Sequence, residues 1–176
     1  MNTASARLLV FASGRLACIK IAGRANFTSS LDFKLLIHEL SDKAVIRFVL
    51  DLSECVLMDS TFLGVLAGFG LEMSKSQNGQ SIELMDATPR IVELLENLGV
   101  LHLFKVITSP CPDLPNDGAT PMAVPGTHAT REEITRTCLE AHKTLMEIDA
   151  ANIPKFKEVA QFLAEDLKKL KGNSGT

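Results

Sequence analysis

The stretch "DLSECVLMDSTFLGVLAGFG", Asp51 to Gly70, is the most informative part of the sequence, because it joins an apolar strand to an apolar segment that contains several glycines. A polar pair, Asp59 and Ser60, stands at the junction. Such a pair suits an ordinary helix start, since short polar side chains cap the free amide groups of the first turn. It equally suits a catalytic nucleophile, or a position where charge is switched on and off. The surrounding sequence has to separate these three interpretations.

Upstream of this stretch the sequence predicts a hairpin, a helix and a buried strand. "RLLVF" and "RLACIKIAG" flank the turn residues 12–14, which is typical of an antiparallel hairpin. "AVIRFVLDL" is a nearly continuous apolar run, as expected of a strand covered on both faces. Between them "FTSSLDFKLLIHEL" predicts a helix with hydroxyl residues as N-caps and an apolar face of Leu31, Leu35, Leu36 and Leu40.

Downstream, two more helices alternate with two more strands. "TFLGVLAGFGLEMSKSQ" predicts a helix in which Gly64 and Gly68 share a face that a neighbouring strand approaches closely. Asn78-Gly79 signals a turn before the strand "SIELMD". "TPRIVELLENLGV" predicts a helix capped by Thr88 and ended by Gly99, and "LHLFKVI" predicts a final strand.

The order β-β-α-β-α-β-α-β predicts an α/β domain with a mixed, mainly parallel sheet and connecting helices over residues 1–108. Residues 109–130 hold five prolines and two glycines and predict a linker or a surface-hugging extended segment. Residues 131–172 predict a C-terminal helical hairpin, with Thr130 and Glu133 as a capping box.

Each predicted C-terminal helix carries apolar residues at steps of three and four, and two lone helices bury such stripes poorly without another surface. The hairpin therefore either covers its own domain or joins a homodimer or another partner. The stripes are Ile134, Cys138, Ala141, Leu145 and Ile148, then Phe156, Val159, Leu163, Leu167 and Leu170.

The composition of the chain argues against several classes of function. The net charge of -3 and the lack of Lys/Arg runs argue against nucleic-acid binding. The longest uncharged apolar run, "FLGVLAGFGL", is far shorter than the roughly 20 residues of a membrane span, and no secretory h-region is recognised. We therefore expect a cytoplasmic protein with reduced cysteines, whose scattered spacing predicts no zinc site and no other metal or cofactor.

Catalysis at Ser60 finds little support in the sequence. The residue lacks a G-x-S-x-G elbow, and the four histidines stand in contexts that suggest no general base. The spacing G-x-x-x-G-x-G also matches neither of the common phosphate-binding loops. We expect a protein that is not an enzyme.

The residues resemble a known family. "FVLDLSECVLMDSTFLGVLAGFG", followed by "NGQSIELMDATPRIVELLENLGVLHLFKVITS", is similar to the STAS domain of bacterial anti-sigma-factor antagonists. The likeness extends over about residues 5–108 and includes "IAGRANFTSS", which looks like the loop into the first helix of that family. The C-terminal helices lie outside it.

The resemblance implies a partner-switching regulator. An anti-sigma factor with serine kinase activity would bind the unphosphorylated protein, releasing a sigma factor, and would phosphorylate Ser60; a phosphatase would reset the cycle. Asp59, Thr61, Phe62 and Asn26 would contribute to the partner surface. A second interpretation is a STAS scaffold in a signalling or lipid-transport complex, in which Ser60 is never phosphorylated.

Two positions depart from the family pattern. Phe62 stands where the family usually has Gly, so it would place a ring beside the phosphoacceptor and alter partner fit, alter kinase access or supply an apolar contact. Ala25-Asn26 replaces the more usual acidic residue of the first loop.

Overall fold

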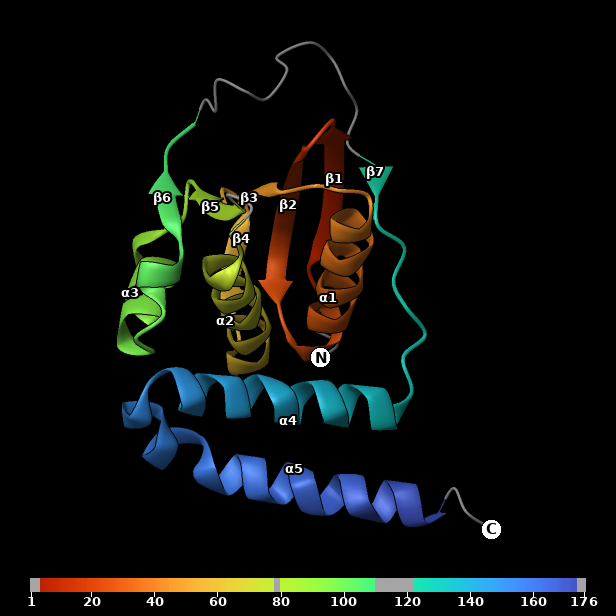
Figure 1. The fold of residues 1–176 in the computed structure, drawn as a ribbon. Helices are drawn as coiled ribbons and strands as arrows, with labels where there is room; N and C mark the ends of the chain where they lie inside the picture. The colour runs from red at the N-terminus through yellow and green to blue at the C-terminus, as the bar shows by residue number, and fades with distance from the viewer. Residues whose placement is uncertain (1–3, 78–79, 110–121, 174–176) are drawn as a thin grey trace.

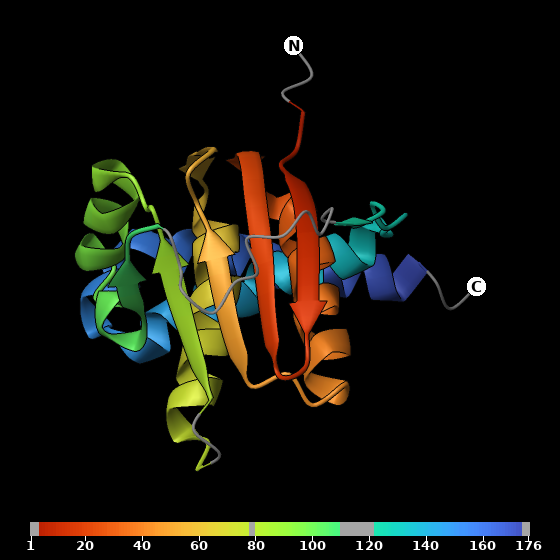
Figure 2. The same ribbon diagram turned by 90° about the horizontal axis from the view of Figure 1, so that it is seen from above.

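The computed structural model describes residues 4–77, 80–109 and 122–173, and in this part of the chain the elements form three layers. A β-sheet forms the first layer, helices α1, α2 and α3 cover one of its faces, and helices α4 and α5 lie beyond them (Figures 1 and 2). The strands are β1 Arg7–Ser13, β2 Leu16–Ala25, β3 Arg47–Asp51, β4 Cys55–Met58, β5 Ser81–Met85, β6 Lys105–Ile107 and β7 Met122–Ala123. The helices are α1 Phe27–Asp42, α2 Ser60–Lys75, α3 Pro89–Asn97, α4 Arg131–Ile148 and α5 Ile153–Asn173, with short 3₁₀ turns η1 Leu101–Leu103 and η2 Ala150–Asn152.

The sheet has the order β6-β5-β3-β2-β1-β7. Strands β2, β3, β5 and β6 pair in parallel, whereas β1 pairs antiparallel with β2 and β7. This confirms the predicted mixed, mainly parallel sheet and its N-terminal hairpin. The expected final strand is shorter than predicted, because η1 takes the first residues of "LHLFKVI".

Strand β4 was not predicted as a separate element, and it positions the junction of interest. The chain leaves β3 at Asp51 and turns, and β4 then pairs in parallel with the far end of β2, where the register shifts between Gly23 and Arg24. Gly23 has φ +103, a conformation that favours glycine. As a result β4 ends beside the end of β2, and helices α1 and α2 start next to each other.

The apolar face of α1 differs from the predicted one. Its buried apolar residues include Phe33, Ile37 and Leu40, whereas Leu35 is 46% exposed. The predicted hydroxyl caps were also wrong: the N-cap is Asn26, whose side chain accepts from the backbone amides of the first turn. The predicted apolar face was wrong because it was drawn from leucine residues alone. It left out Phe33, whose ring contacts two phenylalanine rings of helix α2.

Helix α2 is buried on nearly every side, as its apolar sequence requires. Gly64 does mark a close backbone approach, but the neighbour is helix α4 and not a strand, as the sequence had suggested. A Cβ atom added at Gly64 would lie 2.5 Å from the carbonyl oxygen of Ala141. Gly68 faces the same helix more loosely, because a Cβ atom added there would lie 3.7 Å from the Thr144 methyl group.

The predicted ends of two helices are confirmed. Thr88 caps α3, and Gly99 follows it with φ +69. Thr130 and Glu133 form the predicted capping box of α4, and the backbone amide of Thr130 lowers the pKa of the Glu133 carboxyl by hydrogen bonding. The turn predicted at Asn78-Gly79 lies outside the described residues.

Helices α4 and α5 form the predicted C-terminal pair and pack on the same chain. Figure 1 shows α4 crossing below α1 and α2, with α5 packed against its outer side. Ala141 and Leu145 of α4 belong to the main hydrophobic core. The extended residues before α4 pair with β1 at Met122–Ala123. Residues 110–121 of the predicted linker lie outside the described part, and the domain boundaries remain predictions.

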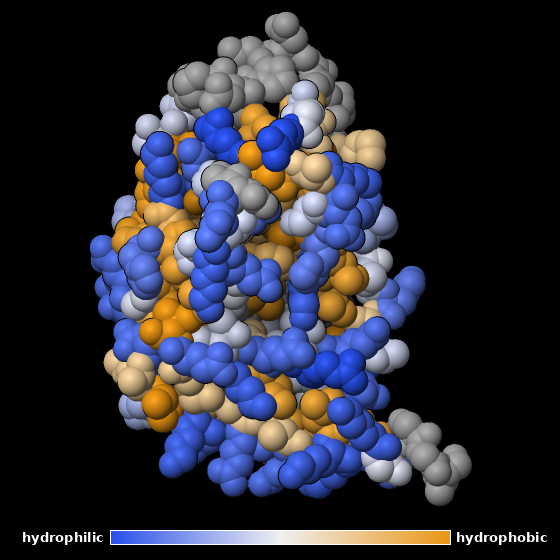
Figure 3. Space-filling model, in the orientation of Figure 1, coloured by the Kyte–Doolittle hydropathy of each residue, from blue (hydrophilic) through white to orange (hydrophobic). Residues whose placement is uncertain are grey.

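The outer surface of the pair is mixed. On the face seen in Figure 3, hydrophilic side chains predominate along α4 and α5, with hydrophobic ones between them. The exposed hydrophobic residues of α5 include Val159 and Phe162. Within the described residues, no helix combines the length and apolar character needed to cross a membrane.

One buried asparagine holds the C-terminal pair against the rest of the protein. Asn152 is fully buried, and its Nδ2 atom donates to the carbonyl oxygens of Leu98 and Leu145, each at 2.9 Å. We predict that Asn152→Ala lowers the free energy of unfolding by about 2–3 kcal/mol, because buried carbonyl groups lose donors. Urea unfolding followed by circular dichroism measures this, since the chain lacks Trp and Tyr.

The matched control for Asn152→Ala is Asn97→Ala. Asn97 stands at the end of α3, in the same part of the molecule, and its side chain is exposed. A surface change of this kind should alter the free energy of unfolding by no more than about 0.5 kcal/mol. Equal losses for the two variants would contradict the anchoring role of Asn152.

Candidate functional site

The two residues of the polar pair predicted from the sequence have different roles, and Asp59 caps helix α2. Its Oδ1 atom accepts from the amide of Phe62 at 2.8 Å, and its Oδ2 atom accepts from the amide of Phe27 at 2.8 Å. The backbone amide of Asp59 also donates to the carbonyl oxygen of Ala25 at 2.9 Å. One carboxylate thus caps α2 and binds the first turn of α1. A negative charge is favourable there because both helix N-termini carry partial positive charge.

Ser60 is the first residue of α2, and its hydroxyl is directed to a different part of the chain. Its Oγ atom lies 2.9 Å from Nε2 of His142, which belongs to α4. Nδ1 of the same ring lies 2.7 Å from the carbonyl oxygen of Cys138. The ring also packs against Phe156 of α5, with 5.2 Å between the ring centroids. Ser60 itself is only partly buried.

The bond to Cys138 fixes the role of each ring nitrogen of His142. A carbonyl oxygen can only accept, so Nδ1 must carry a proton. In the neutral ring Nε2 is then an acceptor, and the Ser60 hydroxyl donates to it. No pattern in the sequence indicates this contact, because His142 lies 82 positions from Ser60 and only the packing of α4 on α2 brings the two together.

The other predicted site residues lie near this pair, but two of them are buried. Thr61 is 5% exposed and hydrogen-bonds the Cys138 thiol of α4. Phe62 is fully buried, and its ring packs against Phe33 with centroids 5.0 Å apart. The predicted apolar contact of Phe62 with a partner therefore does not fit this arrangement, because its ring fills the space between α1 and α2.

Asn26 and Phe27 form the accessible border of the site. The Asn26 side chain accepts from the amides of Thr28 and Ser29 and from the Ser5 hydroxyl, so it holds the start of α1. Phe27 is 47% exposed, and its amide donates to Asp59. Phe27, and not Phe62, is therefore the exposed aromatic residue beside the site. Its position just after a helix cap was the signal available in the sequence.

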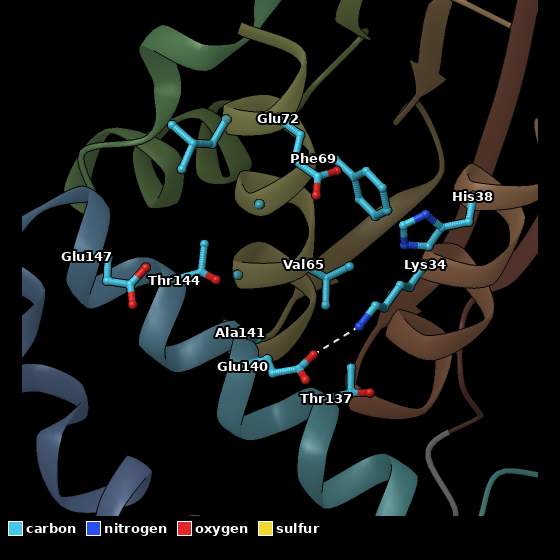
Figure 4. A pocket seen from close by; sticks show the side chains of 13 residues that line it. Lys34, His38, Val65, Phe69, Glu72, Thr137, Glu140, Ala141, Thr144 and Glu147 are labelled. Atoms are coloured by element: carbon cyan, nitrogen blue, oxygen red, sulfur yellow. Dashed lines mark hydrogen bonds and ion pairs between the residues drawn. The ribbon is translucent and has the colours of Figure 1, made fainter. Parts of the chain in front are cut away.

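Helix α4 covers the first half of α2 but does not seal against it. A cavity of about 260 Å³ lies between α1, α2 and α4 (Figure 4). Val65 and Phe69 contribute apolar surface, and Glu72, Glu140 and Glu147 contribute carboxylates. The Lys34 ammonium group reaches the Glu140 carboxylate at 3.0 Å, joining α1 to α4.

Burial under α4 also affects a thiol. Burial raises the pKa of the Cys138 thiol, and the hydrogen bond from Thr61 opposes that shift. A raised pKa leaves less thiolate at neutral pH, so Cys138 should react slowly with alkylating reagents while α4 is in place.

A serine with a histidine beside it has the parts of a nucleophile and base, a pairing that the sequence contexts of the four histidines did not suggest. However, His142 is 5% exposed, and a substrate cannot reach the pair while α4 is in place. Nδ1 is also held by a backbone carbonyl and not by a carboxylate, unlike a Ser-His-Asp triad. In the described ranges no three His, Cys, Asp or Glu side chains are grouped to hold a metal ion.

Comparison with known proteins gives the family. The STAS domain model matches residues 10–110, which is more than half of the 176 residues, and the chain belongs to the STAS domain family. No curated protein matches the chain in sequence.

Solved structures show the same fold. SpoIIAA, an anti-sigma factor antagonist in its unphosphorylated form, aligns with a TM-score of 0.51 at 15% identity, over 58% of this chain and 89% of that one. An anti-sigma factor antagonist from Mycobacterium paratuberculosis aligns with a TM-score of 0.51 at 17% identity, over 62% and 89%. At these identities the likeness shows the fold, which is that of anti-sigma-factor antagonists.

We predict that Asp59→Ala lowers the free energy of unfolding by roughly 2 kcal/mol, because the amides of Phe62 and Phe27 lose their acceptor. Asp59→Asn should lose about half as much, since its single carbonyl oxygen keeps one of the two bonds. Urea unfolding followed by circular dichroism measures both. An Asn variant as unstable as the Ala variant would show that the charge, and not the cap, matters.

Proposed function

We propose that this protein is a phosphorylation-controlled partner-switching regulator. The unphosphorylated form binds an anti-sigma factor that is also a serine kinase, and this binding releases a sigma factor. Transfer of phosphate to Ser60 ends the binding, and a phosphatase restores it. In this role the protein is a kinase substrate and a binding module of the cytoplasm, not an enzyme.

The proposal rests on the different roles of Asp59, which caps α2, and Ser60, which does not. Asp59 alone caps α2, so the Ser60 hydroxyl takes no part in holding the helix start. Its hydrogen bond runs to His142, which lies outside residues 10–110 matched by the STAS family model. A hydroxyl at the first helical position can therefore be modified without removing a bond on which the STAS fold depends.

The negative charge of the phosphate explains how phosphorylation of Ser60 would change partner binding. A phosphoserine carries about -1.5 to -2 charges, which the N-terminus of α2 tolerates because of its partial positive charge. Together with Asp59 the phosphate would make a strongly anionic surface beside the exposed Phe27. A partner surface that is apolar or acidic is then repelled, while the fold stays unchanged.

One observation favours a second function. The Ser60 hydroxyl is already hydrogen-bonded to His142, so Ser60 also suits a purely structural role in joining α2 to α4. The protein would then be a STAS scaffold whose partner binding ignores phosphorylation. The two functions differ in whether phosphate is ever found on Ser60.

We predict phosphate on Ser60 in protein purified from the cells that make it, and none on Ser60→Ala. Intact mass and phosphopeptide mapping measure this. A tagged wild-type protein should also retain a partner with an ATP-binding kinase domain, and Ser60→Asp should weaken that binding about tenfold or more, by charge repulsion and desolvation.

The matched control is Ser74→Asp. Ser74 is an exposed serine at the other end of the same helix, so a charge there should leave partner binding unchanged. The switch is refuted by unmodified Ser60 in every growth condition together with full binding by Ser60→Asp. That pair of results would favour the scaffold.

A further inference from the structure

We propose that α4 and α5 form an intramolecular cover, which competes with the partner for the Ser60 end of α2. This inference rests on the proposed function, because it concerns control of the same site. The closed form in the structure would be the resting form, and kinase and partner would gain access when the two helices swing away.

The first argument is occlusion of the reacting atom. Phosphoryl transfer needs the attacking hydroxyl and the leaving group roughly in line, with catalytic groups of the kinase around them. In the structure His142 lies 2.9 Å from the Ser60 oxygen and is itself backed by Phe156 of α5. Thr61, the next residue of α2, is itself buried and interacts with the Cys138 thiol of α4. A kinase cannot surround Ser60 while these two helices stay in place.

The second argument is that α4 occupies a helix-binding groove. Ser60, Gly64 and Gly68 recur every four residues and so lie along one side of α2. Gly64 lets the backbone of α4 come so close that a Cβ atom would lie 2.5 Å from the Ala141 oxygen. The occupant is therefore known: it is α4, and a partner using this side of α2 must displace it.

The third argument is the character of the contact. On the side facing α1 and α2, the α4 residues that line the cavity are polar except for Ala141: Thr137, Glu140, Thr144 and Glu147. The buried His142 adds a polar contact with Ser60. The cavity under α4 and the Lys34–Glu140 ion pair interrupt the apolar packing further. Contacts between parts of a chain that move relative to each other are more polar than a permanent core. The buried residues of α2, by contrast, are almost all apolar.

The connections leave a hinge available. Asn152 ties the turn between α4 and α5 to Leu98 at the end of α3, and the Lys155 ammonium group donates to the Asn97 carbonyl oxygen at 2.8 Å. Arg131 and Asp166 join the other ends of α4 and α5 at 3.0 Å. The segment before α4 is also tied down, because the Thr127 amide donates to the Asp32 carboxylate of α1 at 2.8 Å. The two helices can thus move as one body that stays attached at the turn and at this segment while its middle separates from Ser60.

The test uses a methyl group as a wedge between α2 and α4. Gly64→Ala places a Cβ atom against the backbone of Ala141, whereas Gly68→Ala makes only an ordinary contact with the Thr144 methyl group. Both changes raise helix propensity, so α2 itself is not weakened. Gly68→Ala is therefore the matched control for the wedge.

Opening is measured first, without any partner, from the alkylation rate of Cys138 by iodoacetamide in the purified full-length chain. Gly64→Ala should raise that rate about tenfold or more, since overpacking typically costs enough free energy to shift an opening equilibrium by that factor. Gly68→Ala should react like wild type. An unchanged rate in Gly64→Ala would overturn the proposal, because α4 would then be a fixed part of the core.

Phosphate occupancy of Ser60 is measured next, by peptide mapping of the same variants purified from the cells that make the protein. Gly64→Ala should carry several-fold more phosphate than wild type and Gly68→Ala. Equal occupancy despite a reactive Cys138 would overturn the cover. Absence of phosphate from all variants, with Cys138 exposed in Gly64→Ala, would instead overturn the proposed function.

A second variant answers the question if Gly64→Ala unfolds the whole chain. Lys34→Glu places a negative charge opposite Glu140 and should push α4 away, again raising Cys138 reactivity and Ser60 occupancy. Lys43→Glu is its control, because Lys43, the C-cap of α1, pairs with Glu39 of the same helix and not with α4. The same effect in both Lys variants would show general destabilisation and overturn the proposal.

Discussion

The Asp59 carboxylate is the interaction on which the rest of the site depends. It binds the first turns of α1 and α2 at once, through the amides of Phe27 and Phe62. Because both helices start at this point, the carboxylate fixes Ser60 and Phe27 on one surface. The same arrangement leaves the Ser60 hydroxyl outside the capping network, and this makes a charge switch compatible with an unchanged fold.

The C-terminal helices give this STAS domain a feature that residues 10–110 do not contain. In the structure they form a third layer over the helices, in contact with the site itself (Figure 1). The contact through His142 has two possible meanings, a permanent brace and a removable cover. The buried polar residues of α4 and the cavity beside Gly64 favour the removable cover. Ala141 and Leu145 belong to the hydrophobic core, so their contacts set the free energy needed to open the cover.

Phe62 shows how a departure from a family pattern finds its explanation inside the protein. The resemblance to the family, which usually has glycine at this position, implied a ring beside Ser60 that would alter partner fit or kinase access, or supply an apolar contact. In the structure the ring contacts Phe33 and is fully buried. The extra volume is absorbed between α1 and α2, and the accessible aromatic side chain at the site is that of Phe27.

Five features could be predicted from the amino-acid sequence: the α/β class, the mixed and mainly parallel sheet, the cap at Thr88, the capping box of α4 and the polar pair at the start of α2. Those features depend on local periodicity and on contacts within a few residues, which sequence patterns report directly. Tertiary structure alone decided the Ser60–His142 contact, the burial of Phe62 and the helix that fills the space beside Gly64. Each of these depends on where α1 and α4 pack against α2, and no local pattern carries that information.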